Sequence, residues 1–223
     1  MRRLKDNGLS LFFGTIFLLS LLGQSVSGLA DYNNQQLSSG GDPVSFWHYV
    51  SSSSFAVDVA ENWQSEYLQF LLYILATVWL VQQGSTESKE PDKVGRESDK
   101  EQKVGRYAED DSPAWAKVGG WRTALYSRSL GTVMGLVFLG SWLAQSVAGR
   151  AAYNAEQLSE LSDPVSWIGY VTSADFWDRT LQNWQSEFLA VASMVLFSVY
   201  LRQRGSPESK PVGSPHTATG VEG

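Results

Sequence analysis

The sequence predicts an all-α membrane protein with four transmembrane helices, arranged as two tandem helical-hairpin repeats with short extracytoplasmic helices. One observation is a pair of apolar runs, at about 9–28 and 129–149, each of roughly 20 residues and long enough to cross a bilayer. Another is the motif Asn-Trp-Gln-Ser-Glu, which occurs at residues 62–66 and again at 183–187. The same shift of 121 positions matches about half of the residues between Leu9 and Lys89 with identical ones. We therefore interpret the chain as a tandem duplication.

The composition excludes several classes of protein and site. The chain has 223 residues, 17 basic and 23 acidic, with a formal net charge of -6, so no nucleic acid is expected as a partner. It has no cysteine, which excludes disulfides and thiolate metal sites, and only two histidines. The sequence contains no glycine-rich phosphate loop and no nucleophile elbow. We therefore expect no metal, no cofactor and no enzymatic activity.

The first apolar run has two interpretations. Arg2, Arg3 and Lys5 precede it and small residues end it, as in a secretory signal peptide. A retained transmembrane helix at about 9–28 also fits its length. The equivalent run at about 129–149 lies in the middle of the chain, where no amino-terminal signal is cleaved. The repeat therefore favours a retained helix.

Residues 29–61 are expected to form an extracytoplasmic loop, because they carry acidic residues but no lysine or arginine. Asp42, which precedes Pro43, has the pattern of a helix N-cap with proline at the first helical position. Ser53 or Ser54 has the pattern of a second N-cap. We therefore expect two short helical pieces here, the second continuing without a break into the next apolar run.

The second span of each copy is expected at about 62–82 and 183–202. The apolar part of the first, residues 67–81, reaches only about 22 Å at 1.5 Å per residue, against a hydrocarbon core of roughly 30 Å. A span that starts near Ala60 is long enough and places aromatic anchors at both interfaces. The expected anchors are Trp63 and Trp79 in the first copy, and Trp184 and Tyr200 in the second. A buried or re-entrant segment is the alternative.

The expected organisation is repeat 1 at residues 1–83, a charged flexible cytoplasmic linker at 84–121, repeat 2 at 122–204 with its outer loop at 150–182, and a disordered cytoplasmic tail at 205–223. All but two of the 17 basic residues lie in the amino terminus, the linker region and the tail; the exceptions are Arg150 and Arg179 in the outer loops. The positive-inside rule therefore places both termini and the linker in the cytoplasm.

A polar stripe follows one face of the second span, because its members are three or four residues apart. They are Asn62, Glu66, Gln69, Tyr73 and Thr77, and their second-copy equivalents are Asn183, Glu187, Ala190, Met194 and Ser198. The middle of the stripe is apolar in the second copy, so no symmetric polar pore is expected. The Asn and Glu at the outer end are kept in both copies. An ionisable group at membrane depth suggests proton or cation handling, and a structural role in the wet interface is the alternative.

Two glutamines are expected to join these pairs. Gln24 and Gln145 lie near the outer ends of the first spans, level with the Asn and Glu of the next helix once each hairpin closes. We therefore expect two equivalent hydrogen-bonded clusters, in which polar side chains hold helices together. The first comprises Gln24, Asn62 and Glu66, and the second comprises Gln145, Asn183 and Glu187.

Two further patterns indicate packing. Gly131 and Gly135 are four residues apart, a spacing that lets a neighbouring helix approach closely. Residues 84–89 and 205–210, which follow the second span of each copy, share the pattern Gly-Ser-x-Glu-Ser-Lys. Either a shared contact on the cytoplasmic face or a recent duplication explains this match.

The assembled motifs resemble those of a bacterial membrane protein family known as domain of unknown function 6766. The motifs that carry the resemblance are Asp-Asn-Gly-Leu-Ser at 6–10, Gln-Ser at 24–25, Asn-Trp-Gln-Ser-Glu followed by Tyr or Phe and Leu in both copies, and residues 202–210. The resemblance covers essentially the whole chain. It implies a location in the bacterial cytoplasmic membrane and supplies no activity or catalytic residue.

The functional expectation is a non-enzymatic structural or interaction component of the bacterial cell envelope. The lipid bilayer is the expected partner, together with another membrane protein or further copies of the chain. The alternative is a small transporter or channel component that uses Glu66 and Glu187 for proton or cation handling.

Overall fold

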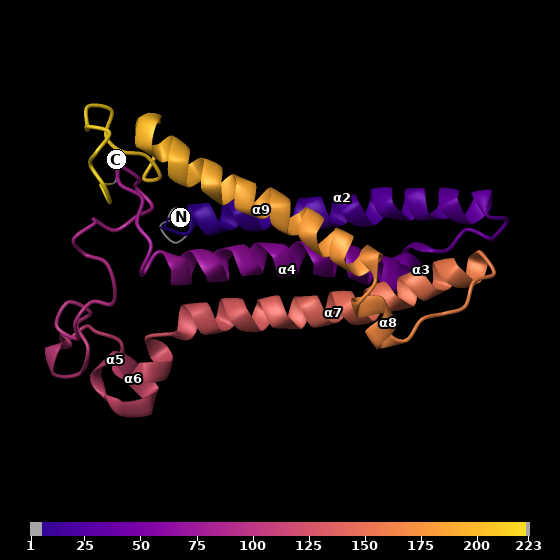
Figure 1. The fold of residues 1–223 in the computed structure, drawn as a ribbon, viewed down its shortest axis with the longest axis horizontal. Coiled ribbons are helices and arrows are strands. Elements are labelled where there is room, and N and C mark those ends of the chain that lie inside the picture. Colours follow the sequence, from indigo (N-terminus) through magenta and orange to yellow (C-terminus); the bar gives the residue numbers. More distant parts are fainter. Residues whose placement is uncertain (1–5, 222–223) are drawn as a thin grey trace. The chain divides into compact units, whose positions relative to one another are not determined.

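The computed structural model describes residues 6–221, and every regular element in that range is a helix (Figure 1). Within this range the long helices are α2 (Gly8–Ser38), α4 (Ser53–Ala76), α7 (Ser129–Ser159) and α9 (Ala174–Tyr200). The short ones there are α3 (Phe46–Val50), η1 (Gly105–Tyr107), α5 (Ala114–Lys117), α6 (Gly120–Tyr126) and α8 (Trp167–Val171). The all-α class is confirmed for the described residues. Arg2, Arg3 and Lys5, on which the expected orientation partly rests, lie outside them.

Two helices of the described chain, α2 and α7, are long and apolar enough to cross a membrane. Each has 31 residues, which corresponds to about 46 Å at 1.5 Å per residue and exceeds a hydrocarbon core of roughly 30 Å. Little of either apolar stretch is buried, in contrast to the core helix of a soluble protein. The sequence predicts four such helices, whereas α4 and α9, although long enough, do not meet the same requirement of apolar composition.

The helices α2 and α7 continue beyond the predicted span ends near residues 28 and 149. The first part of the expected outer segment at 29–61 is therefore helical, because polar residues do not by themselves end a helix and no proline interrupts the backbone hydrogen bonding before Pro43. The chain leaves α2 only at Ser39 and Gly40, where Gly40 adopts a φ of 77° that favours glycine.

The predicted N-caps are each displaced along the chain. Asp42 does not cap α3; the cap is Ser45, whose hydroxyl accepts a hydrogen bond from the backbone N–H of His48 at 3.4 Å. Ser52 accepts from the N–H of Phe55 at 3.2 Å and so caps the start of α4 in place of Ser53 or Ser54. As predicted, α4 then runs unbroken through residues 62–66.

The end of α4 at Ala76, rather than near residue 82, is a correction to the sequence analysis. The hydroxyl of Thr77 donates back to the carbonyl of Tyr73 at 2.8 Å, and the carbonyl of Val78 accepts from the N–H of Gly95 at 2.8 Å. The linker therefore takes a carbonyl that a longer helix would have used. Trp79 lies beyond the helix, so the helical spacing expected between it and Trp63 does not hold.

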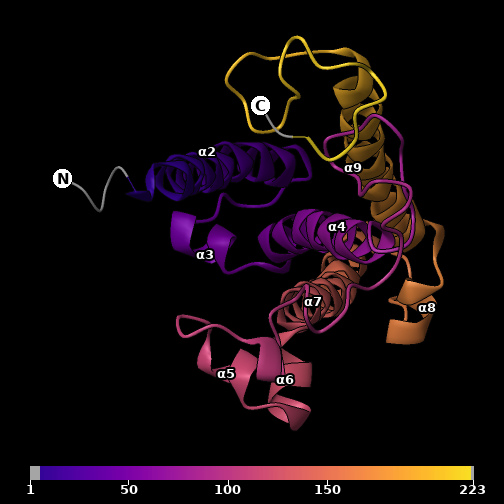
Figure 2. The same cartoon turned by 90° about the vertical axis from the view of Figure 1, so that its left-hand side faces the viewer.

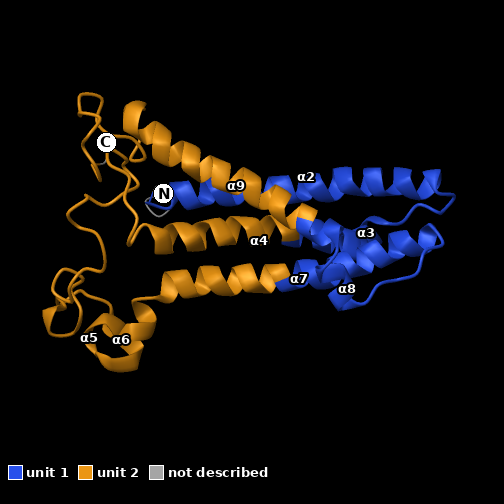
Figure 3. Cartoon of the chain, viewed as in Figure 1, with its two compact units in different colours: residues 1–60, 143–177 blue, residues 61–142, 178–223 orange. Residues whose placement is uncertain are grey.

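The chain divides into two compact units (Figure 3). Unit 1 comprises residues 1–60 and 143–177, which include α2, α3, α8 and the adjoining ends of α4, α7 and α9. Unit 2 comprises residues 61–142 and 178–223, which include the rest of those three helices, the linker and the tail. Each unit draws on both halves of the sequence, so the units do not coincide with the expected repeats at 1–83 and 122–204.

Within unit 1, the turn between α2 and α3 is held by Asn33. Its side chain donates to the carbonyl of Val44 at 3.1 Å and accepts from the N–H of the same residue at 2.7 Å. Tyr49 of α3 is buried against α2, so close to Gly28 that a Cβ at that glycine would lie 2.2 Å from the tyrosine hydroxyl oxygen. The Tyr49 ring also packs edge-on against Phe55, with centroids 5.4 Å apart.

The same contacts recur 121 residues later, also within unit 1. Asn154 holds Val165 with hydrogen bonds of 3.0 and 2.8 Å. Tyr170 is fully buried against Gly149, where a Cβ would lie 2.3 Å from the hydroxyl oxygen, and its ring packs edge-on against Phe176 at 5.6 Å. The turn after α2 and the turn after α7 are therefore each closed by an asparagine clamp, in which the asparagine bonds both backbone groups of one residue, and by a tyrosine packed against a glycine.

Within unit 2, α4 lies beside both α7 and α9 (Figures 1 and 2). A Cβ at Gly131 or Gly135 of α7 would lie 3.9 or 3.7 Å from the side chains of Leu75 and Leu71 of α4. The two glycines of α7 therefore pack against leucines of α4, as the four-residue spacing of small residues predicts.

A substitution of Gly149 by Ala is expected to lower the free energy of unfolding by about 1–3 kcal/mol, because the new methyl group overlaps the Tyr170 hydroxyl. Gly140→Ala on the same helix is the matched control, since no atom lies within 4 Å of its added Cβ. Thermal unfolding in detergent measures both, and Tyr170→Phe should partly restore the first variant. Equal stability of the two alanine variants would contradict the tyrosine-on-glycine contact.

Candidate functional site

The residues of the two predicted clusters belong to different units. Gln24, half-buried on α2, and Gln145, fully buried on α7, lie in unit 1. The other members, Asn62, Glu66, Asn183 and Glu187, lie on α4 and α9 within unit 2. Each cluster thus combines both units and stays a prediction.

Inside unit 2, Asn62 and Glu66 lie on α4, and Asn183 and Glu187 lie on α9. The side chain of Asn183 donates to the carbonyl of Arg179 on its own helix at 2.9 Å. Glu66 is exposed on α4 and Glu187 is half-buried on α9, so the proton or cation site expected at these two acids stays a prediction.

The centre of the repeated motif forms a contact that the sequence analysis did not single out. Gln64 is fully buried, and its side-chain oxygen accepts a hydrogen bond from the indole N–H of Trp184 at 2.8 Å. One turn earlier in α4, the carboxylate of Glu61 pairs with the guanidinium of Arg179 at 3.3 Å. Trp184, expected as an interface anchor, thus joins α9 to α4. The sequence signal that could have indicated this contact is that both motifs have a glutamine at the same position, Gln64 and Gln185.

The other expected anchors are more exposed. Trp63, Trp79 and Tyr200 have 39%, 57% and 60% of their surfaces accessible. Such exposure is compatible with an amphipathic ring at a bilayer boundary. Trp79, however, lies in the segment that follows the end of α4.

The two exit segments, residues 84–89 and 205–210, fold into the same turn within unit 2. The N–H of Gln82 donates to the hydroxyl of Ser88 at 2.9 Å, and the N–H of Gln203 donates to Ser209 at 2.8 Å. The first serine of each pattern also accepts from the N–H of the glutamate two residues later, at 3.1 and 3.2 Å. The glycine and serines recur in both segments for a local structural reason, because these residues form the turn that follows each helix.

The two lysines of this pattern differ in their surroundings. Lys210 is 1% exposed, and its ammonium donates to the carbonyls of Gly84 at 2.5 Å, His216 at 3.0 Å and Ala218 at 3.1 Å. Burial and the nearby Arg202 guanidinium lower the pKa of Lys210, while the carbonyl oxygens hydrogen-bond its charged form. The tail, expected to be disordered, is thus wrapped around an ammonium in the described structure.

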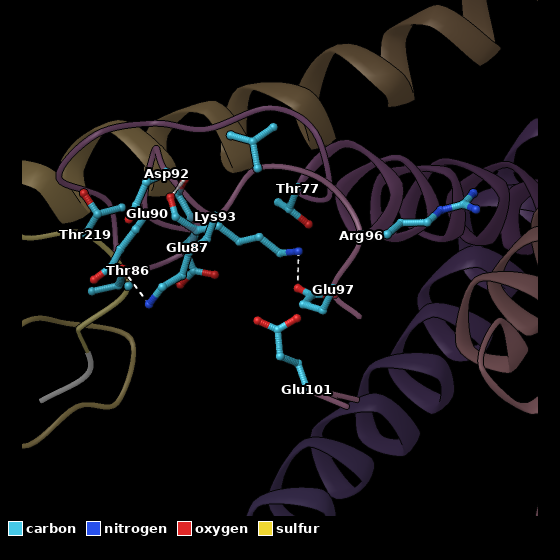
Figure 4. Close-up of a pocket in the computed structure, with 14 residues that line it drawn as sticks. Thr77, Thr86, Glu87, Glu90, Asp92, Lys93, Arg96, Glu97, Glu101 and Thr219 are labelled. Carbon is cyan, nitrogen blue, oxygen red and sulfur yellow. Dashed lines mark hydrogen bonds and ion pairs between the residues drawn. The ribbon is translucent and has the colours of Figure 1, made fainter. Parts of the chain in front are cut away.

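Lys89, the equivalent of Lys210, instead pairs with Glu97 and donates to the carbonyl of Gly95 at 2.9 Å. Its hydrogen bond lowers the pKa of the Glu97 carboxyl. Both residues line a cavity of about 640 Å³ in the linker, which also contains Glu101 and the ion pair of Lys93 with Glu90 at 2.6 Å (Figure 4). Charges of both signs alternate around it. No group of three residues suited to a metal ion occurs among residues 6–221.

The fold and these contacts define an all-helical protein with two helices able to cross a membrane, whose repeated polar motifs form hydrogen bonds inside the molecule. The chain belongs to the family described as Domain of unknown function (DUF6766), whose model matches residues 1–221. Comparisons with curated proteins and with solved structures found no match.

Lys210→Met is expected to lower the free energy of unfolding by about 2 kcal/mol, because it leaves several buried carbonyls without their donor. Lys100→Met, at an exposed linker position, is the matched control and should leave stability unchanged. Urea unfolding in detergent gives both values. If the tail is digested faster by protease in Lys210→Met but not in Lys100→Met, the loss of stability arises from release of the tail.

Proposed function

We propose that the chain is a multi-pass protein of the bacterial cytoplasmic membrane, built from two tandem helical-hairpin repeats with four transmembrane helices. In this arrangement both termini and the linker are cytoplasmic. Length supports α4 and α9 as the additional spans, since their 24 and 27 residues correspond to about 36 and 40 Å. The recurrence of the asparagine clamp and the seated tyrosine after 121 residues supports the repeats.

The function we propose is a non-enzymatic structural or interaction role in the cell envelope, with lipid as one partner and another membrane protein or further copies of the chain as the other. The observation that supports this proposal is that polar side chains of the repeated motifs form hydrogen bonds within the protein. Gln64 and Trp184 bond to one another between α4 and α9, and Lys210 is enclosed by backbone carbonyls. Side chains so engaged hold helices and turns together, which is what a scaffold for partners requires.

Cysteine accessibility tests the proposed topology, because the chain contains no natural cysteine. Leu161→Cys, at a position 97% exposed in the loop after α7, should react with an impermeant maleimide from outside the cell. Asp111→Cys in the linker should react only after permeabilisation. If α2 and α7 were the only spans and the amino terminus were cytoplasmic, the two variants would show the opposite pattern.

A second function, proton or cation transport, rests on the acids Glu66 and Glu187, one in each copy of the Asn-Trp-Gln-Ser-Glu motif. A structural role predicts no ion flux above that of empty liposomes. Transport predicts flux that is lost in Glu66→Gln/Glu187→Gln and retained in Glu156→Gln/Glu160→Gln, whose acids are exposed at the end of α7. Proton-sensitive and potassium-sensitive dyes in proteoliposomes, at matched incorporation, provide the measurement.

A further inference from the structure

The segment that joins the linker to α7, residues 113–128, contains the short helices α5 and α6 and belongs to unit 2 (Figures 1 and 3). Gly119 and Gly120 separate the two helices in the sequence. The hydroxyl of Thr123 on α6 donates to the carbonyl of Trp115, the second residue of α5, at 2.6 Å. This hydrogen bond ties the helices into one unit, which we call the α5–α6 hairpin.

Burial in the α5–α6 hairpin is the reverse of that in a water-soluble unit. Its buried side chains include the small ones of Ala116 and Thr123, each 8% exposed. Its large apolar side chains are exposed, with Trp121 at 68% and Val118 at 58%. The others exposed in this way are Trp115, Leu125 and Tyr126. So many large apolar side chains on the surface of a short segment mark a site that lipid or another protein covers.

The charge of the hairpin indicates which of these partners it fits. Lys117, Arg122 and Arg128 are exposed, and the sequence has no acidic residue at positions 112–155. Within the described residues 6–221, none of the three cations pairs with a carboxylate, whereas three lysines earlier in the linker do form such pairs. The hairpin therefore combines exposed apolar rings with uncompensated positive charge. Amphipathic segments of this composition bind membrane surfaces that contain anionic lipid.

The rings and the cations of the hairpin are also neighbours in space. Trp115 and Trp121 pack edge-on, with their ring centroids 6.2 Å apart. The guanidinium carbon of Arg122 lies 5.5 Å from the centroid of the Trp121 ring. An indole beside a guanidinium is suited to the boundary of a bilayer, where the ring contacts acyl chains and the cation contacts phosphate.

The position of the hairpin in the chain brings it close to lipid. α7 begins at Ser129, directly after Arg128, and is one of the two described helices long and apolar enough to cross a membrane. A segment attached to the end of a membrane-spanning helix is held at the bilayer surface. Lipid is therefore the nearest partner that can cover the exposed rings.

We propose that the α5–α6 hairpin docks on the surface of the bilayer that α7 crosses and binds anionic lipid headgroups there. Trp121 and its apolar neighbours enter the boundary between headgroups and acyl chains, and Lys117, Arg122 and Arg128 contact the phosphates. The inference rests on the proposed membrane location and adds to it a binding site and a class of lipid. It does not require that α4 and α9 also cross the membrane.

The test places the environment-sensitive dye NBD on single cysteines, because the described chain has no free cysteine. Val118→Cys reports on the hairpin, Asp99→Cys on an exposed linker position, and Leu136→Cys on an exposed position of α7. The full-length proteins are reconstituted in vesicles of phosphatidylcholine, alone or mixed equally with phosphatidylglycerol, and brominated acyl chains serve as the quencher. The dye at 136 should be quenched in both vesicles and the dye at 99 in neither. The dye at 118 should be quenched, and more strongly in the mixed vesicles.

Lys117→Gln/Arg122→Gln should lower the ratio of lipid-bound to free dye at position 118 by at least about tenfold in the mixed vesicles, because two cations are lost. Lys93→Gln/Arg96→Gln, the matched control, removes the same charge from exposed linker positions and should leave the ratio unchanged. Trp121→Ser should lower quenching in both vesicles, because it removes apolar surface and no charge. Circular dichroism establishes that each variant is folded.

The outcomes separate this inference from the proposed membrane location. Quenching at 136 but not at 118 would overturn docking of the hairpin and leave the membrane location intact. Absence of quenching at 136 would overturn the membrane location and the inference together. Blue-shifted emission at 118 without quenching by brominated lipid would show that protein covers the hairpin instead, and equal quenching in the two vesicles would exclude the preference for anionic lipid. The vesicle comparison needs none of the charge or tryptophan variants, so it decides the question even where one of them does not fold.

Discussion

The hydrogen bond between the Trp184 indole and the buried side chain of Gln64 is the contact on which unit 2 depends. An amide buried at a helix interface costs free energy unless it finds a partner, so the bond restricts how α4 and α9 meet. The pair of Arg179 with Glu61, one turn earlier in α4, adds a charged contact between the same helices. The same two helices also line a cavity of about 270 Å³, between residues 69–73 of α4 and residues 190–194 of α9.

The two exit segments, residues 84–89 and 205–210, form the same turn but place their final lysine in different surroundings. In both, a serine hydroxyl receives the N–H of a glutamine and closes a turn beyond the helix. The lysine at the end of the turn then diverges: Lys89 meets a carboxylate and stays partly exposed, whereas Lys210 is buried among carbonyls. An ammonium is retained in a dry site only where enough acceptors replace its water. The tail supplies those acceptors, which gives it a defined course.

The positions of the helices follow from the sequence more closely than their ends do. Apolar runs and motif recurrence located the long helices because both are local properties of the chain. The ends were missed where a distant group intervened, as when Gly95 takes the carbonyl of Val78 and α4 stops at Ala76. The N-caps were missed by a few residues because several serines and aspartates compete for the same role, and the local backbone decides among them.

The sequence by itself determined the helical class, the family and the positions at which the two halves share residues. It identified Asn62, Glu66 and their equivalents as candidate residues, since an acid within an apolar helix is visible in the letters. Only the tertiary structure decided that Gln64 bonds to Trp184, that Lys210 is enclosed, and that equivalent residues line one cavity. The physical reason is that periodicity fixes the face on which a side chain lies, whereas its partner depends on how separate segments pack.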